Sequence, residues 1–244
     1  QQDGVEFMLG PYSTTMTKAV APVTEKFKVP MVEAEGASRS LFTQGYKYMF
    51  AVLSTSEYYL APVLDIMADK AKAMGKNPSD LRISMAFEND GFSLDVRAGV
   101  VDKAKEHGMK IVIDDKLPAD LSDMSATLTK TKALKPDILL VSGHSKGAAT
   151  AARQIEEMKI DVPLIAYTHC EAAKVQEKFP KSANGVMCPT QWLSNLPKGD
   201  DYFGDAAKWN SDFKKSYPEY SVVPYQTAQA SAAVLVFKDA FERA

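Results

Sequence analysis

Two polar turns near the N-terminus carry side chains that could hold a charged ligand. In the first, an apolar run ends at Gly10 and Pro11, and Tyr12, Ser13 and Thr14 lead into a helical pattern. The first amides of a helix lack partners and lie at the positive end of its dipole, so hydroxyls beside them favour a carboxylate or a phosphate. Ser13 and Thr14 could equally serve only as a helix cap.

The second turn, residues 34–40, follows the next apolar run and places Glu35 two residues after Glu33. A carboxylate at such a position could pair with a cationic group of a ligand, or it could belong to a solvated loop. The residues alone leave both interpretations open.

Two histidines follow apolar runs further along the chain. His144 lies within Gly143-His144-Ser145-Lys146-Gly147, which formally matches the G-x-S-x-G turn of hydrolases, and His169 follows the run that ends at Tyr167. No oxyanion loop or acidic partner follows in the order that such hydrolases need, and no G-x-G-x-x-G indicates a dinucleotide cofactor. Contact with a ligand and a surface or capping role are both compatible with these histidines.

The two cysteines, Cys170 and Cys188, are compatible with a disulfide, two buried thiols or a metal pair. Buried thiols are slightly favoured. Zinc is the least favoured alternative, because no C-x-x-C or Cys/His spacing of a structural zinc site is present, although His169 adjoins Cys170. We expect neither a metal nor a cofactor.

Composition narrows the possible partners. The chain has 244 residues, of which 45% are hydrophobic and 25% charged, so it can bury a full core in one large or two modest domains. Its 29 basic and 31 acidic residues give a net charge of −2, which disfavours nucleic acid and an anionic membrane surface. No apolar run has the length of a transmembrane helix, and we expect no signal peptide among the first residues of the chain. A small molecule or a protein is the expected partner.

Apolar runs alternate with amphipathic stretches, which predicts an α/β fold. The most regular part has short loops and nearly continuous apolar strands, and such a series forms a parallel sheet covered by helices on both faces. Its strands are expected at 81–87, 110–113, 138–141 and 163–167, and its helices at 93–106, 122–134 and 147–158.

Other elements flank this series. A helix over 16–27 is expected to pack through one face made of Ala19, Val20, Val23 and Phe27. The run 185–192 predicts a strand that Pro189 confines to an edge or a bend. Strands are also expected at 29–33 and 46–52, and helices from about 54 to 74, at 202–217 and at 225–243.

Several of these stretches, taken in order, resemble the type I periplasmic solute-binding proteins of ABC transporters, of the branched-chain amino acid and amide-binding kind. Residues 3–14 are similar to the family's "dgVdfilGPysS", and residues 21–32 to its "ApvaeeagvPmi". The loop 36–38 (Gly-Ala-Ser) and the turn 89–92 (Asn-Asp-Gly-Phe) match two further family segments. Their order and spacing make the resemblance specific, and it covers nearly the whole chain.

The resemblance implies two doubly wound, Rossmann-like lobes joined by a hinge, with the ligand enclosed between them. On this basis residues 1–53 and 191–244 form lobe 1, and residues 54–190 form lobe 2. It also implies that the chain is a fragment that lacks N-terminal and C-terminal parts of the fold.

The resemblance also assigns ligand-binding roles to individual positions. Ser13 and Thr14 match residues that hold the ligand carboxylate, Gly36 and Ser38 match residues that add a backbone group and a hydroxyl, and Phe92 and His144 match aromatic positions. His169 aligns where amino acid binders carry the acid that pairs with the ligand ammonium, so Glu35 or Glu171 takes that role or the ligand has no ammonium. The expected ligand-binding residues are Tyr12, Ser13, Thr14, Glu35, Gly36, Ser38, Phe92, His144, Tyr167 and His169.

The expected function is that of a periplasmic binding protein, or an extracellular, membrane-tethered one in a Gram-positive source, which is not an enzyme and delivers a small carboxylate to an ABC permease. An aromatic or other hydrophobic carboxylate is slightly favoured as the ligand, because the aromatic residues expected near the site suit a planar or unsaturated group. A branched-chain or other amino acid and a ligand-sensing receptor domain are the alternatives.

Overall fold

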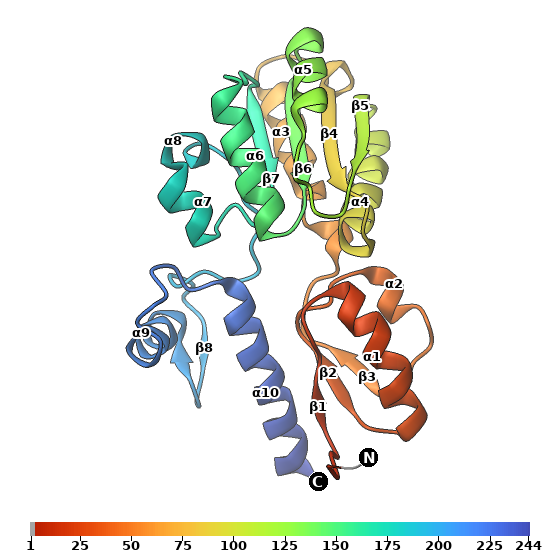
Figure 1. Ribbon diagram of the computed structural model, residues 1–244, viewed down its shortest axis with the longest axis vertical. Helices are drawn as coiled ribbons and strands as arrows, with labels where there is room; N and C mark the ends of the chain where they lie inside the picture. Colours follow the sequence, from red (N-terminus) through yellow and green to blue (C-terminus); the bar gives the residue numbers. More distant parts are fainter. Residues whose placement is uncertain (1–2) are drawn as a thin grey trace. The chain divides into compact units, whose positions relative to one another are not determined.

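The computed structural model describes residues 3–244, without the side chains of Ala173 and Lys174 (Figure 1). The chain divides into two compact units. Unit 1 comprises residues 1–54 and 190–244, and unit 2 comprises residues 55–189. Residues 1 and 2, which the expected first lobe includes, lie outside the described residues.

Unit 2 is built on a four-stranded parallel sheet with the order β5-β4-β6-β7. The chain passes from β4 to β5 in one direction and then returns across β4 to β6, so β4 and β6 form the topological switch point of the sheet. Ligands bind outside the carboxyl ends of strands at such a point. The strands are β4 (Arg82–Glu88), β5 (Lys110–Leu117), β6 (Ile138–Ser142) and β7 (Leu164–Tyr167).

Helices cover both faces of this sheet, as the alternating pattern predicts (Figure 1). Leu139 and Val141 of β6 pack with Leu128, Ala151 and Ile155 from α5 and α6 in one buried cluster. Because neighbouring strand residues point to opposite faces, Ile138 and Leu140 point towards the other face. The helical segments are η1 (Ser56–Tyr58), α3 (Ala61–Ala73), η2 (Pro78–Asp80), α4 (Gly91–His107), α5 (Ser125–Leu134), α6 (Ser145–Glu157), α7 (Ala173–Lys178) and α8 (Pro180–Ala183).

Unit 1 has a three-stranded parallel sheet, β1-β2-β3, and a short antiparallel pair, β8-β9. Ala233 of α10 is buried with Val32 and Ala34, and Phe7 contacts Phe241 of the same helix at a ring distance of 4.6 Å. The elements are β1 (Met8–Leu9), α1 (Thr14–Phe27), β2 (Met31–Glu33), α2 (Arg39–Phe42), β3 (Met49–Ala51), β8 (Gly199–Asp200), β9 (Gly204–Asp205), α9 (Ala206–Ser216) and α10 (Tyr225–Arg243).

The predicted buried face of helix α1 is wrong. Val23 and Phe27 are exposed, whereas the buried residues of α1 are Thr14, Thr17, Ala21 and Thr24. The threonines tolerate burial because their hydroxyls find partners: that of Thr24 donates to the Ala21 carbonyl, and that of Thr17 donates to the carboxylate of Glu33. Hydrophobic periodicity could not detect a buried face made of hydrogen-bonded threonines.

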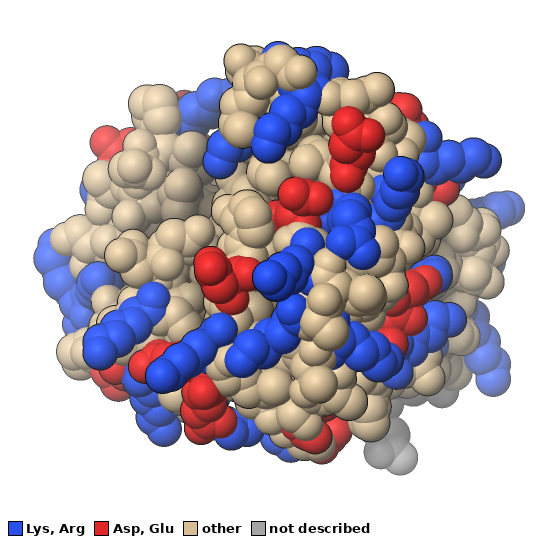
Figure 2. All heavy atoms as spheres, turned by 90° about the horizontal axis from the view of Figure 1, so that it is seen from above, with Lys and Arg blue, Asp and Glu red and all other residues tan. Residues whose placement is uncertain are grey.

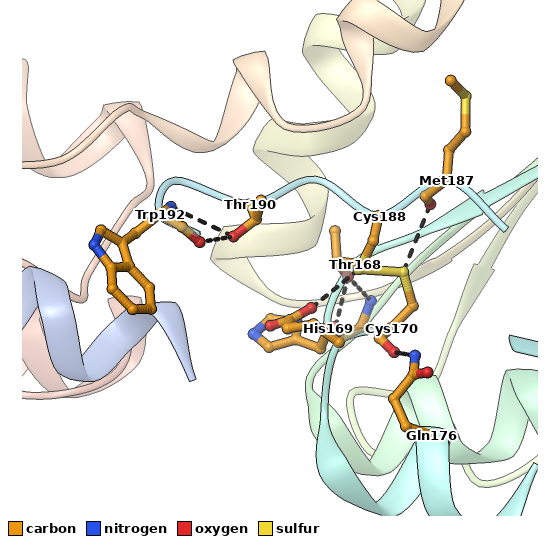
Figure 3. The surroundings of a disulfide bond; sticks show 10 residues. Thr168, His169, Cys170, Gln176, Met187, Cys188, Thr190 and Trp192 are labelled. Carbon is orange, nitrogen blue, oxygen red and sulfur yellow. Dashed lines mark hydrogen bonds between the residues drawn. A yellow bond between two sulfur atoms is a disulfide. The ribbon is translucent and has the colours of Figure 1, made fainter. Parts of the chain in front are cut away.

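Two expectations for the end of unit 2 also differ from the structure. The run 185–192 forms no strand and makes only an isolated parallel bridge between Met187 and Ala166, because the chain leaves the sheet at Pro189. The slightly favoured alternative of two buried thiols is wrong as well, since Cys170 and Cys188 form a disulfide (Figure 3).

Charges of both signs are interspersed on the face drawn in Figure 2, and neither sign gathers into a stripe. Within residues 3–244, no helix combines the length and the hydropathy that crossing a membrane requires.

Candidate ligand-binding site

The first half of the candidate site lies in unit 1, where β1 leads into helix α1. Ser13 is the N-cap residue of α1 in an extended conformation, but its side chain makes no capping hydrogen bond. Thr14 is buried, and its hydroxyl oxygen accepts the amide of Ser38 at 3.2 Å, which ties the two predicted turns together. Tyr12, in contrast, is 48% exposed. The backbone amides at the N-terminus of α1 are therefore not capped by the side chain of Ser13.

Glu33 holds the second turn of unit 1 in place. It is fully buried at the end of β2, which rules out the solvated-loop interpretation for this residue. Its Oε1 accepts the amides of Glu35 at 2.7 Å and Gly36 at 2.6 Å, and its Oε2 accepts the Thr17 hydroxyl at 2.8 Å. Gly36 has no room for a side chain, because a Cβ there would overlap Thr17. Glu33 is thus a structural carboxylate that shapes the turn around it.

Glu35 lies in the same turn, but its carboxyl group differs from that of Glu33 in its hydrogen bonding. Its Oε2 is buried and has no hydrogen-bond partner among residues 3–244. Burial, and then the nearby charge of Glu33, raise the pKa of Glu35 to about 8. Among the remaining polar groups of the turn, the hydroxyls of Ser38 and Ser40 lie 2.9 Å apart. A buried carboxyl oxygen without a partner is rare in folded proteins and calls for an explanation such as a bound water, ion or ligand.

The second half of the candidate site lies in unit 2, at the carboxyl ends of β4 and β6. Asp90 caps α4 by accepting the Ser93 amide at 2.7 Å, and its other oxygen lies 2.9 Å from Nε2 of His144. Burial opposes charge on the imidazole, but the hydrogen bond to Asp90 and the charges of Asp90 and Glu88 raise the pKa of His144. The switch point of the sheet thus holds an ion pair between its two central loops.

The imidazole of His144 belongs to a cluster of four rings that also includes Tyr59, Phe92 and His169. Phe92 lies 5.3 Å from Tyr59, 5.4 Å from His144 and 5.8 Å from His169, measured between ring centroids. Nδ1 of His169 donates to the Gly143 carbonyl at 2.9 Å, and burial, followed by the charge on His144, lowers the pKa of His169 to about 4. His169 is therefore a neutral imidazole with a fixed orientation at neutral pH, whereas the pKa of His144 is raised by its contact with Asp90.

Glu88 is a site residue that the sequence analysis missed. It ends β4, is 1% exposed, and accepts the His144 amide at the start of α6. A Cβ on either Gly143 or Gly147 would lie 2.6 Å from its Oε1, which explains both glycines of the G-x-S-x-G sequence. Burial is the main cause that raises the pKa of Glu88 to about 7. An acidic residue at the end of an otherwise apolar strand was the available signal.

The loop after β7 is held from two sides (Figure 3). Thr168 accepts the Gly143 amide at 3.0 Å and donates to the Gly143 carbonyl at 2.7 Å, and Gln176 donates to the carbonyl of Cys170 at 2.8 Å. The disulfide joins Cys170 to Cys188. Tyr167 is fully buried within the cluster of α5 and α6, and its hydroxyl lacks a hydrogen-bond partner among the described residues.

The structure thus brings the expected residues together in two groups, one in each unit. Tyr12, Ser13, Thr14, Glu35, Gly36 and Ser38 lie on two adjoining loops of unit 1, and Phe92, His144 and His169 share one ring cluster in unit 2. Tyr167 belongs to the core instead of a loop surface. Glu171, the other acid considered for an ammonium, has its Oε2 3.1 Å from Sγ of Cys188.

Hydrolysis through Ser145 and metal binding in unit 2 are the two chemical alternatives to a ligand-binding site. Ser145 is an exposed first residue of α6, and the nearby His144 is paired with Asp90. Glu88, Asp90 and His144 have ligand atoms within 4.8 Å of one another, which is a donor set that could contact a metal ion. Hydrogen bonds within unit 2 already engage all three residues, so their arrangement is explained without a metal.

Parallel α/β units with polar loops at the carboxyl ends of their strands occur in both enzymes and binding proteins, so the class of this protein comes from the comparison with known families. A model of the periplasmic binding protein family matches residues 1–244, so the chain belongs to that family, and its fold is that of the type I members. The family is periplasmic.

Individual relatives are distant. "Leu/Ile/Val-binding protein homolog 8" of Brucella abortus is 23% identical over 155 residues, which cover 63% of this chain and 38% of the relative. A leucine-binding protein of Thermotoga maritima superposes with a TM-score of 0.80 at 21% identity, covering 100% of this chain and 65% of that one. A solute-binding protein of Rhodopseudomonas palustris, solved in complex with 3,4-dihydroxybenzoic acid, superposes with a TM-score of 0.80 at 16% identity. The superposition covers 99% of this chain and 63% of that one. The chain therefore spans less than two thirds of these relatives.

Proposed function

We propose that the protein captures a small carboxylate between two lobes, which correspond to units 1 and 2, and presents it to an ABC permease in the periplasm. One observation carries the proposal: the N-terminus of α1 lacks a cap from Ser13 and is flanked by hydroxyls of two loops. Helix N-termini bind carboxylates through their amides and their dipole. Family membership supports the delivery of the ligand to a permease.

Unit 2 supplies the surface for the rest of the ligand in this proposal. The ring cluster of Phe92, His144 and His169 lies at the carboxyl ends of β4 and β6, and Phe92 and His169 are each 5% exposed, so a ligand would meet its edge. Aromatic rings contribute apolar contact area with few rotatable bonds. An aromatic or other hydrophobic group on the carboxylate fits such a lining. Solved relatives include one whose complex contains 3,4-dihydroxybenzoic acid and one described as a leucine-binding protein, so both kinds of ligand occur on this fold.

Binding without catalysis is part of the same proposal. The G-x-S-x-G sequence has a structural explanation in the contact between its glycines and Glu88. We therefore expect no turnover of a generic ester. Ester hydrolysis that Ser145→Ala abolishes would contradict this expectation.

The test is a titration calorimetry and thermal-shift panel of amino acids, hydroxybenzoates and aliphatic acids. A ligand at 100 times its Kd adds about 2.7 kcal/mol to the free energy of unfolding, which a thermal shift detects readily. The double variant Ser13→Ala/Thr14→Ala should weaken binding at least tenfold, and Ser122→Ala, which removes an exposed hydroxyl of unit 2, should leave it unchanged. Unchanged affinity in the double variant would refute the assignment of the carboxylate to α1.

A further inference from the structure

Glu35 lies in the second turn of unit 1, and no contact among the described residues explains its role in the folded protein. Glu33, two residues earlier, has both carboxylate oxygens engaged by amides and a hydroxyl. Glu35 has the opposite character, because its Oε2 is buried without a partner among the described residues. Leaving a buried polar atom unpaired costs about 1 to 3 kcal/mol, and more for a charged one. A ligand that supplies the missing partner would remove this cost.

The position of Glu35 in the loop indicates which part of a ligand its carboxyl group would contact. It follows β2 directly and precedes Gly36 and Ser38, and Ser38 is hydrogen bonded to Thr14 at the start of α1. A carboxyl group adjoining the expected carboxylate seat would repel a simple acid when ionised. The same group would stabilise a cation placed beside the carboxylate, because opposite charges attract strongly where water is excluded.

We propose that Glu35 is the specificity-determining residue of the site, and this proposal rests on the proposed function. Its carboxylate pairs with a protonated amine that the ligand carries next to its own carboxylate. This places the counter-charge for the amine in unit 1, whereas position 169 in unit 2, which aligns with an acid of the family's amino acid binders, is a histidine. That histidine is neutral and hydrogen bonded to Gly143, so it does not compete for a cation.

One rival role must be separated from this one. Since burial and Glu33 raise the pKa of Glu35 to about 8, its carboxyl group holds a proton at neutral pH in the unliganded protein. A protonated carboxyl could donate to the ligand carboxylate instead of accepting from an amine. The two roles predict opposite pH dependence. Pairing with an amine requires Glu35 to lose its proton, so binding tightens as the pH rises towards 8, whereas donation to a carboxylate weakens over the same range.

The experiment compares ligands that differ only in the amine. Leucine is matched with 4-methylpentanoate and phenylalanine with 3-phenylpropanoate, and each is titrated calorimetrically into wild type, Glu35→Gln and Glu35→Ala at pH 6, 7 and 8. We expect one of the amino acids to bind at least tenfold more tightly than its amine-free partner, at least tenfold more tightly at pH 8 than at pH 6, and at least tenfold less tightly to both variants. Glu219→Gln, which neutralises an exposed carboxylate of unit 1, is the matched control.

Each outcome has a defined meaning. If an amine-free acid binds as tightly as its amino acid partner, or if Glu35→Gln retains full affinity for the amino acid, the proposal for Glu35 is wrong while carboxylate capture stands. If no carboxylate binds wild type at any of the three pH values, the proposed function is wrong, and the proposed role of Glu35 is wrong as well. Thermal unfolding of each variant without ligand checks that the fold is retained.

Discussion

Glu33 is the residue on which the second turn of unit 1 depends. We expect Glu33→Ala to lower the free energy of unfolding by about 3 kcal/mol, because it leaves two amides and the Thr17 hydroxyl without their acceptor. Glu33→Gln keeps one carbonyl oxygen for the amides and should cost about 1 kcal/mol. Urea unfolding of both variants measures the difference. A Glu33→Ala variant as stable as wild type would show that the hydrogen bonds of Glu33 do not stabilise the turn.

Glu88 should make the stability of unit 2 depend on pH. Its pKa of about 7 in the folded protein lies above the ordinary value of 4.5, so the folded state binds the proton more tightly than the unfolded state does. Stability from this group is therefore complete below pH 4.5 and is lost as the pH rises towards 7, by up to about 3 kcal/mol.

The variant Glu88→Gln cannot ionise and should remove this loss. Relative to wild type, its free energy of unfolding should therefore increase between pH 4.5 and pH 8. Chemical denaturation across this pH range is the measurement. A difference between variant and wild type that does not change with pH would mean that Glu88 stays ionised in the folded protein.

The role of these acids was only partly accessible from the sequence. Glu35 was recognised as a candidate because it lies in a turn after an apolar run. Glu33 and Glu88 were not assigned their roles, since Thr17 lies 16 positions from Glu33 in the chain and His144 lies 56 positions from Glu88. The amide of Gly36 is near Glu33 in sequence but reaches its carboxylate only in the folded turn. Tyr59 was missed for the same reason, because its ring contact with Phe92 joins η1 to α4.

At the level of elements, the disulfide is the feature with the clearest energetic consequence. It closes a segment with a sequence separation of 18, which contains α7 and α8. The entropy of closing such a loop in the unfolded chain corresponds to about 3 kcal/mol. We expect Cys170→Ser/Cys188→Ser to lose about this amount in urea unfolding.

Reduction provides the control for this prediction. Dithiothreitol should lower the stability of wild type towards that of the double variant and should not affect the variant. Wild type that is equally stable with and without the reductant would contradict a stabilising disulfide.

Elements with strong periodicity were predictable, and those that depend on distant partners were not. The strands and helices of unit 2 between residues 81 and 167 all appear, because apolar runs buried on both faces of a parallel sheet leave a clear pattern. The buried face of α1 was predicted wrongly because its threonines satisfy their hydroxyls internally and through Glu33. The run 185–192 has the composition of a strand, but Pro189 lacks the amide that pairing needs.

For the whole molecule, capture between two lobes predicts protection in both units at once. Hydrogen exchange with the tightest-binding carboxylate of the panel should slow amides in residues 13–17 and 35–40 of unit 1 and in residues 89–93 and 143–147 of unit 2. Amides of α9, which carries none of the proposed contacts, serve as the internal reference. Protection confined to one unit would contradict binding between the two.

The contact between Glu88 and two glycines also limits how relatives of this protein can diverge. The space that a Cβ at position 143 or 147 would fill is occupied by the carboxyl group of residue 88. An alanine at either glycine position requires the carboxyl group of Glu88 to move or a shorter residue at position 88, so we expect lineages that keep Glu88 to favour glycine at both positions. These three positions should change together in an alignment of homologues, and the loop carrying His144 should be inherited as a unit with the end of β4.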